Sequence, residues 1–113
     1  MISPVSLSAS GIKAAFDSID VSANNVANAN TDGFKSDTAA FSEGANGGVV
    51  VNIRKSNTPG PAYFKDGKTA VASNTDLVQE TAAEISAKTM ASANIAVLKT
   101  ADEMEKKAID ILA

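Results

Sequence analysis

Apolar residues recur along the first 30 positions of the chain in steps that alternate between four and three residues. This spacing places them on one face of a helix, and it is the heptad pattern of a coiled-coil seam. Ser3 is a suitable N-cap, and Pro4 suits the first helical position, where its missing N–H has no partner to lose. The pattern predicts a helix over residues 1–30. Its seam comprises Val5, Ala9, Ile12, Phe16, Ile19, Ala23 and Val26.

A second and longer helix is predicted over residues 76–113. Asp76 can cap its first turn, while Glu80 near the start and Lys106 near the end complement the helix dipole. Two such long helices in so short a chain cannot wrap a compact core, so we expect them to pair lengthwise as an antiparallel coiled coil, within one chain or between chains. The seam of this helix comprises Ala83, Ala87, Met90, Asn94, Val97, Ala101, Met104, Ala108 and Ile111.

One seam position of the second helix, Asn94, is polar. Two interpretations stay open from the sequence alone. Either the seam is offset and Asn94 faces solvent, or Asn94 is a buried polar residue that fixes the register of the helices at some cost in stability.

The segment between the helices, residues 31–75, has the composition of loops and short strands. Three glycines over residues 44–48 form a flexible lead-in, and the β-branched residues among 49–53 predict a strand. The strand is either an exposed edge that pairs with another chain or, as we favour, part of a local hairpin. Asp66-Gly67 between two further short runs predicts a β-hairpin with a two-residue turn. The sequence therefore predicts one domain over residues 1–113, mainly α with a small β element.

The amino-acid composition excludes most kinds of catalytic site. Without His or Cys the chain lacks an imidazole base, a thiolate nucleophile and the usual zinc ligands. A net charge of −3 with a single arginine, Arg54, is a poor basis for binding nucleic acid. No apolar run is long enough to span a membrane, and no basic segment near Met1 indicates a cleaved signal peptide. We expect no enzyme, no catalytic residue, no metal and no cofactor.

Alanine dominates the apolar content of the chain. It supplies 21 residues, whereas there is one tyrosine and no tryptophan. Alanine-rich seams let helices approach closely but bury little area per residue, at roughly 25 cal/mol per Å². We therefore expect a marginally stable subunit that gains much of its order from neighbouring chains.

The end of the first helix is unusually rich in asparagine, with four among residues 24–30. One interpretation is that these amides fray and cap the helix C-terminus while Gly33 turns the chain. The other is that they bond to backbone and side chains of adjoining subunits and fix the direction in which the chain leaves the helix. Each amide offers two donors and an acceptor, which suits such cross-linking.

Residues 25–35, Asn-Val-Ala-Asn-Ala-Asn-Thr-Asp-Gly-Phe-Lys, resemble the N-terminal signature of the bacterial flagellar axial proteins, which are rod, hook and hook-associated subunits. Residues 73–80 look like the start of that family's C-terminal helix, and residues 93–104 look like its signature. The short middle segment is similar to that of the small proximal-rod subunits. Thr89 and Ala91 stand where relatives commonly have arginine and an aromatic residue, so a divergent paralogue is the alternative.

The resemblance implies a structural subunit of the flagellar basal-body rod that self-assembles through its terminal helices into the axial drive shaft. It implies a place in the periplasmic rod, export through the flagellar type III apparatus without signal cleavage, and contacts with itself and with other rod and hook–basal-body proteins. The alternative is a helical-hairpin binding module or export adaptor of the flagellar system. The residues expected to carry assembly are the signature Asn25, Asn28, Asn30, Thr31, Gly33, Phe34 and Lys35, and the seam residues Ile12, Phe16, Ile19, Val26, Met90, Asn94, Val97, Met104 and Ile111.

Overall fold

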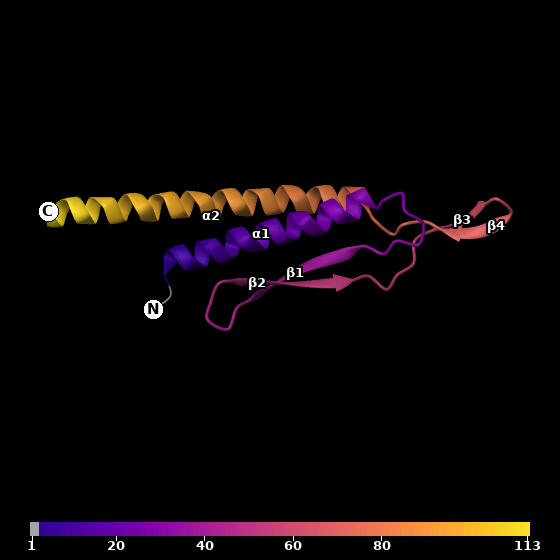
Figure 1. Ribbon diagram of the computed structural model, residues 1–113, viewed down its shortest axis with the longest axis horizontal. Coiled ribbons are helices and arrows are strands. Elements are labelled where there is room, and N and C mark those ends of the chain that lie inside the picture. Colours follow the sequence, from indigo (N-terminus) through magenta and orange to yellow (C-terminus); the bar gives the residue numbers. More distant parts are fainter. Residues whose placement is uncertain (1–2) are drawn as a thin grey trace.

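Two long antiparallel helices and two β-hairpins make up the computed structural model, which describes residues 3–113 (Figure 1). The elements are α1 (Pro4–Ala27), β1 (Asp37–Glu43), β2 (Val49–Lys55), β3 (Ala62–Lys65), β4 (Lys68–Val71) and α2 (Leu77–Leu112). The expected mainly α fold with a small β element between long terminal helices is confirmed. None of the helices in the described part of the chain is both long and apolar enough to span a membrane.

Helix α1 begins where its capping residues predict. Ser3 Oγ accepts the backbone N–H of Val5 at 3.2 Å, and Pro4 occupies the first turn. The helix ends at Ala27, before the predicted limit of residue 30, because Asn28 leaves helical geometry and caps the last turn through its N–H. Residues 1 and 2 of the predicted helix lie outside the described residues.

Helix α2 begins at the predicted cap. Asp76 Oδ1 accepts the N–H groups of Val78 at 2.9 Å and Gln79 at 3.3 Å. With 36 residues against the 24 of α1, α2 extends well beyond the N-terminus of its partner (Figure 1). We call residues 102–112 of α2 the overhang.

The β1–β2 pair is antiparallel from Asp37↔Lys55 to Glu43↔Val49, so the favoured local hairpin is confirmed. Strand β1 was not predicted, because its sequence Asp-Thr-Ala-Ala-Phe-Ser-Glu carries little β-branched or alternating apolar character. The β3–β4 hairpin turns at Asp66-Gly67 as predicted, with φ of 51° and 76° at the two turn residues.

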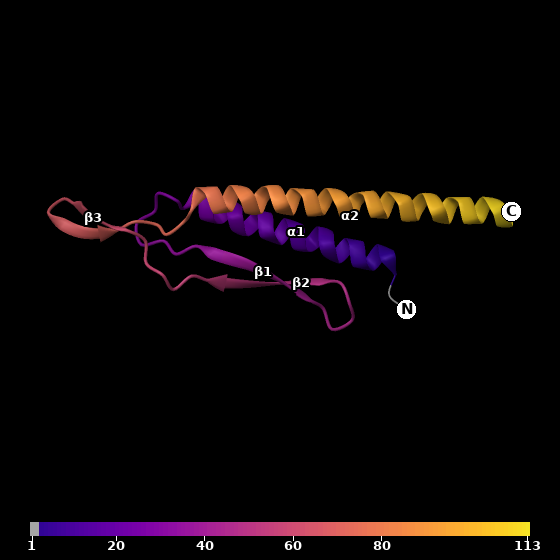
Figure 2. The same cartoon turned by 180° about the vertical axis from the view of Figure 1, so that it is seen from behind.

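Helix α1 lies between α2 and the β1–β2 hairpin, while β3–β4 projects past the ends of the helices (Figures 1 and 2). Ser10 Oγ of α1 accepts the N–H of Val49 at 3.1 Å, which fixes the start of β2 on the helix. A Cβ at Gly48 would lie 2.6 Å from the same Oγ, so the hairpin loop can approach α1 this closely only without a side chain.

The core between the helices is made of small residues. The buried apolar residues of the described chain are Ala14, Ala15, Ala87 and Ala91, and Ile19 and Met90 pack beside them. On α1, the row facing α2 lies one residue earlier than the predicted seam. This row comprises Ser8, Gly11, Ala15, Ser18, Ser22 and Asn25. Small side chains let the helix axes approach closely, whereas the sequence-based seam assumed that the bulkier residues face inward.

Asn94 faces α1, so its solvent-facing interpretation is wrong. Its amide lies directly over Gly11, where an added Cβ would come within 2.6 Å of Asn94 Nδ2. The amide also donates to Met90 O at 2.9 Å. The pair Gly11–Asn94 near one end and Asn25–Glu80 near the other fixes the antiparallel register.

The molecule is much more extended than a compact domain of its size. It measures 79 × 24 × 14 Å with a radius of gyration of 19.9 Å, against about 13 Å for a compact chain of this length. Its accessible surface is 7860 Å², against roughly 5,800 Å² for a typical monomer of this mass. The isolated chain therefore exposes about 2,000 Å² more than a self-sufficient monomer would.

The Gly11–Asn94 contact predicts a non-additive pair of substitutions. In an Asn94→Ala background, Gly11→Ala should stabilise the protein by about 1 kcal/mol, because alanine is the better helix former. With Asn94 present that gain should vanish, since the new Cβ displaces the amide from Met90 O. Urea unfolding of the four proteins measures this coupling. An equal gain in both backgrounds would contradict the packing described here.

Candidate functional site

Asn25 is completely buried and joins three elements of the fold. Its Nδ2 donates to Asp37 O at 2.7 Å and to Glu80 Oε1 at 2.9 Å. Its Oδ1 accepts the N–H of Asp37 at 2.9 Å. The amide of Asn25 therefore pairs with both backbone groups of Asp37, as a neighbouring strand would, and links α1 to β1 and to α2.

Asn74 holds the preceding residue, Ser36, through its backbone N–H. Its Oδ1 accepts the N–H of Ser36 at 2.7 Å, while its Nδ2 donates to Ser56 Oγ at 3.0 Å and Thr58 O at 2.7 Å. We call Ser36 and Asp37 with Asn25 and Asn74 the asparagine junction. It fixes the chain where it enters β1, directly beside the start of α2.

The junction distinguishes between the two interpretations of the asparagine-rich stretch for Asn25. The bonding partners of Asn25 lie in its own chain, not in an adjoining subunit. Asn28 has the capping role, because its Nδ2 donates to Asn24 O at 2.9 Å and its Oδ1 accepts from Thr31 Oγ1 at 3.2 Å. Asn30 is exposed.

The rest of the signature turns the chain. Gly33 has φ of 72°, which favours glycine, and its N–H donates to Val71 O at 2.7 Å. Phe34 is half-buried, and its carbonyl accepts the N–H of Asn74 at 3.2 Å. Lys35 is exposed. Asn74 was not among the predicted site residues, although it stands in the segment 73–80 that carries the family resemblance.

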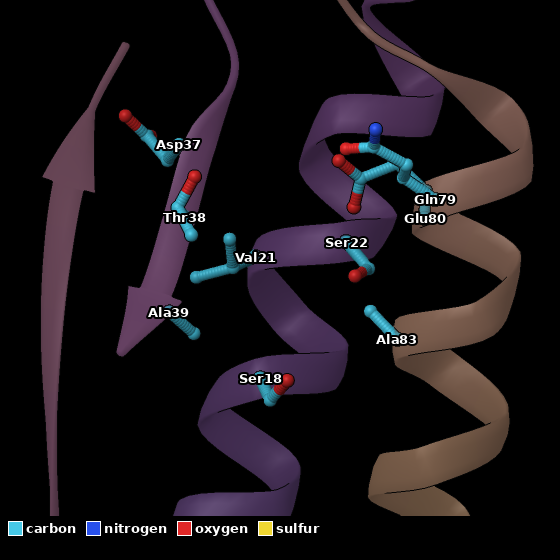
Figure 3. A pocket seen from close by; sticks show the side chains of 9 residues that line it. All are labelled: Ser18, Val21, Ser22, Asp37, Thr38, Ala39, Gln79, Glu80 and Ala83. Atoms are coloured by element: carbon cyan, nitrogen blue, oxygen red, sulfur yellow. The ribbon is translucent and has the colours of Figure 1, made fainter. Parts of the chain in front are cut away.

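A cleft of about 140 Å³ opens between α1, β1 and the first turns of α2 (Figure 3). Glu80 and Ser22 lie close together in Figure 3, whereas the carboxylate of Asp37 points away from them. The two carboxylates therefore do not converge as an acid–base pair would. Among the described residues, no group of three or more His, Cys, Asp or Glu is placed to hold a metal ion.

Residues 28–36, which connect α1 to β1 and which we call the exit loop, are also tied to the projecting β3–β4 hairpin. Tyr63 OH donates to Asp32 Oδ1 at 2.5 Å, and Lys65 Nζ lies 3.5 Å from Asp32 Oδ2. The hydrogen bond from Tyr63, helped by the charge of Lys65, lowers the pKa of Asp32 below 3.8. The same hydrogen bond to a carboxylate raises the pKa of Tyr63 above 10.0. The contact is therefore complete between pH 3.8 and pH 10.0. It is lost only when the pH falls through the lowered pKa of Asp32 or rises through the raised pKa of Tyr63.

The predicted seam residues fall into two groups. Ile12 and Ile19 of α1 and Met90 and Asn94 of α2 are half-buried, and Ile19 and Met90 meet at the alanine core. The others are exposed. They are Phe16 (54%), Val26 (41%), Val97 (48%), Met104 (65%) and Ile111 (83%).

Removing the Asn25 amide should strongly destabilise the fold. Asn25→Ala would leave two half-buried backbone groups of Asp37 without their partner and should cost about 3 kcal/mol in the free energy of unfolding. The matched control is Asn30→Ala, an exposed asparagine of the same stretch, which should change stability by less than about 0.5 kcal/mol. Urea unfolding followed by circular dichroism measures both. Equal effects of the two substitutions would refute the role given to Asn25.

The titration of the single tyrosine tests the Asp32 contact. Ultraviolet absorbance of tyrosinate should give a pKa above 10.0 for Tyr63 in the intact protein. Asp32→Asn should return it toward 10.0, because the carboxylate charge that opposes ionisation is removed. Asp66→Asn, in the turn of the same hairpin, serves as the control. An unchanged pKa in the Asp32 variant would show that the hydrogen bond does not form in solution.

Comparison with known proteins gives a match to α1 and the loop that follows it. The family model described as Flagella basal body rod protein matches residues 7–35, which span most of α1 and the exit loop up to the asparagine junction. No curated protein matches the chain. The matched segment contains the asparagine-rich signature, and the family is a structural one. Over this segment the chain is similar to the flagellar basal body rod protein family.

Proposed function

We propose that the protein is a structural subunit of the flagellar basal-body rod, of the small proximal-rod type, and that it self-assembles through its terminal helices into the axial drive shaft. It passes through the flagellar type III export apparatus without signal cleavage and takes its place in the periplasmic part of the rod. Its partners are further copies of itself and other rod and hook–basal-body proteins. The observation that carries this proposal is the surface that the helix pair leaves uncovered.

The overhang is the plainest part of that surface. Ala101 is the last half-buried residue of α2, and everything after it is exposed. Met104, Ile109, Ile111 and Leu112 lie here with between 58% and 87% of their surface in contact with solvent. No element of the described chain covers these side chains, so their burial has to come from another subunit.

The alanine core fits transport as well as assembly. Because the buried apolar residues are all alanines, unfolding exposes little large apolar surface and costs little free energy. Such a chain can be unfolded for passage through a narrow channel and stabilised afterwards by its neighbours. Contacts between different faces of successive copies then generate a helical tube when their rotation does not close.

A helical-hairpin binding module or export adaptor is the second candidate. It rests on an apolar groove of about 510 Å³ where α1 begins, lined by Pro4, Val97 and Met104 among others. A groove of this kind can hold one helix of a partner. Copy number separates the two functions, since a rod subunit is stoichiometric in purified basal bodies and an adaptor is absent from them.

Deletion of the coding region should abolish motility and rod formation, with basal bodies scored by electron microscopy. A wild-type copy should restore both, whereas a copy truncated after Asp102 should fold but fail to restore the rod. The matched control is Lys106→Ala, which removes the exposed ion pair to Asp102 and keeps every apolar side chain of the overhang. Circular dichroism verifies folding. Normal rods in the deletion strain would reject the proposed function.

A further inference from the structure

The β3–β4 hairpin is anchored on one of its two faces. Side chains alternate between the faces of an antiparallel pair, and Tyr63 and Lys65, two positions apart on β3, both contact Asp32 of the exit loop. Their face therefore lies toward the exit loop. Among the described residues the hairpin packs on no other helix or strand. Its opposite face is left without a covering element.

The uncovered face of the hairpin is apolar and carries an aromatic ring. Phe64 exposes 76% of its surface and stands opposite Thr69 in the pair. Ala62 and Val71 form the other pair on this face, and both are exposed. A two-stranded hairpin is only marginally stable in water unless such a face packs on something. We call Ala62, Phe64, Thr69 and Val71 the hairpin face.

A second uncovered apolar surface lies at the opposite end of the molecule (Figures 1 and 2). There the predicted seam of α2 becomes steadily more exposed, from 48% at Val97 to 65% at Met104 and 83% at Ile111. Pro4 of α1 lines the apolar groove of about 510 Å³ at the start of this stretch. We call the groove and the seam that continues it the end groove. Its residues are Pro4, Val97, Ala101, Met104, Ala108 and Ile111.

The hairpin face and the end groove match in length. The seam from Ala101 to Ile111 is about 15 Å long, and strands of four residues, as in β3 and β4, are about 13 Å long. A single aromatic ring on a short apolar face is also the usual form of an anchor that fills a pocket at an interface.

The two ends of the molecule carry opposite net charges. Cations are in excess around the hairpin, where the exit loop and the segment between β2 and α2 hold Lys35, Lys65 and Lys68 against Asp32 and Asp66. Carboxylates are in excess on the overhang, which holds Asp102, Glu103, Glu105 and Asp110 against Lys106 and Lys107. The hairpin end of one copy is therefore attracted to the overhang of another.

We propose that the hairpin face of one copy packs in the end groove of the next copy, with Phe64 against Pro4, Val97 and Met104 of its neighbour. The inference rests on the self-assembly in the proposed function and deepens it by naming the two faces of a head-to-tail contact. Because these faces lie at opposite ends of the molecule, each contact leaves one of each kind unused. All copies then point the same way, as a helical tube requires.

Cross-linking of cysteine variants tests the contact, and the chain offers a clean background because it contains no cysteine. The contact is smaller than the roughly 800 Å² per partner of a standard interface, so concentrated protein is used. A short bis-maleimide should join Phe64→Cys chains to Met104→Cys chains about tenfold more than to Val78→Cys chains, because the contact raises the local concentration of the two thiols. Val78 is the matched control, since it is 78% exposed at the other end of α2.

Each single variant on its own separates this contact from a symmetric one. Phe64→Cys alone and Met104→Cys alone should give little product. A chain with both substitutions should give a ladder of oligomers, because its two thiols lie at opposite ends of the molecule (Figure 1). Equal yields with Met104→Cys and Val78→Cys would overturn the inference. Pairs of Phe64→Cys alone, at the yield of the mixture, would also overturn it.

Complementation distinguishes this inference from the function on which it rests. Phe64→Glu should fail to restore rods in the deletion strain, whereas Ile53→Glu, at a residue of β2 that is 58% exposed, should restore them. Circular dichroism verifies that both variants fold. Full restoration by Phe64→Glu would overturn the inference and leave the rod function standing, whereas normal rods in the deletion strain reject the function itself. Loss of rods in Val97→Glu but not in Phe64→Glu would assign the end groove to another protein and overturn the inference.

Discussion

The side-chain amides of Asn25 and Asn74 hold two consecutive residues, Ser36 and Asp37, at the point where the chain leaves the helices. The placement of α1, α2 and β1 relative to one another depends on this junction. It sets the register of α1 against α2 through Glu80, and it starts β1 in the direction that lays the hairpin along α1. Because the core consists of alanines, packing alone would specify these positions weakly. Directional hydrogen bonds in a buried site supply the specificity that apolar area cannot.

Much of this architecture can be read from the amino-acid sequence, because capping and turn chemistry are local. Ser3, Asp76 and the Asp66-Gly67 turn each act within a few residues of their own position, and each is found where the pattern places it. Strand β1 escaped prediction because it is a strand only by pairing with β2 and packing on α1. Asn25 bonds to Asp37 and Glu80, which lie 12 and 55 residues away along the chain. The local sequence around Asn25 does not indicate these partners.

On α1, the hydrophobic pattern of the sequence and the observed packing identify different rows of residues. The heptad of Val5, Ile12, Phe16, Ile19 and Val26 is real, but the intramolecular partner takes the adjacent row of glycine, alanine and serine. Small residues allow close contact within the subunit and leave the bulkier row outward. A subunit of an assembly has to reserve apolar surface in this way, because its folded state is completed by its neighbours.

The isolated chain is held at the asparagine junction, whereas its overhang is left uncovered. Amide hydrogen exchange of the purified protein, followed residue by residue by NMR, tests it most directly. The N–H groups of Ser36 and Asp37 should exchange as slowly as those around Ala87 in the core, although they stand at the start of an edge hairpin, while the overhang exchanges rapidly. Fast exchange at Ser36 and Asp37, at the rate of exposed loop residues, would contradict the account.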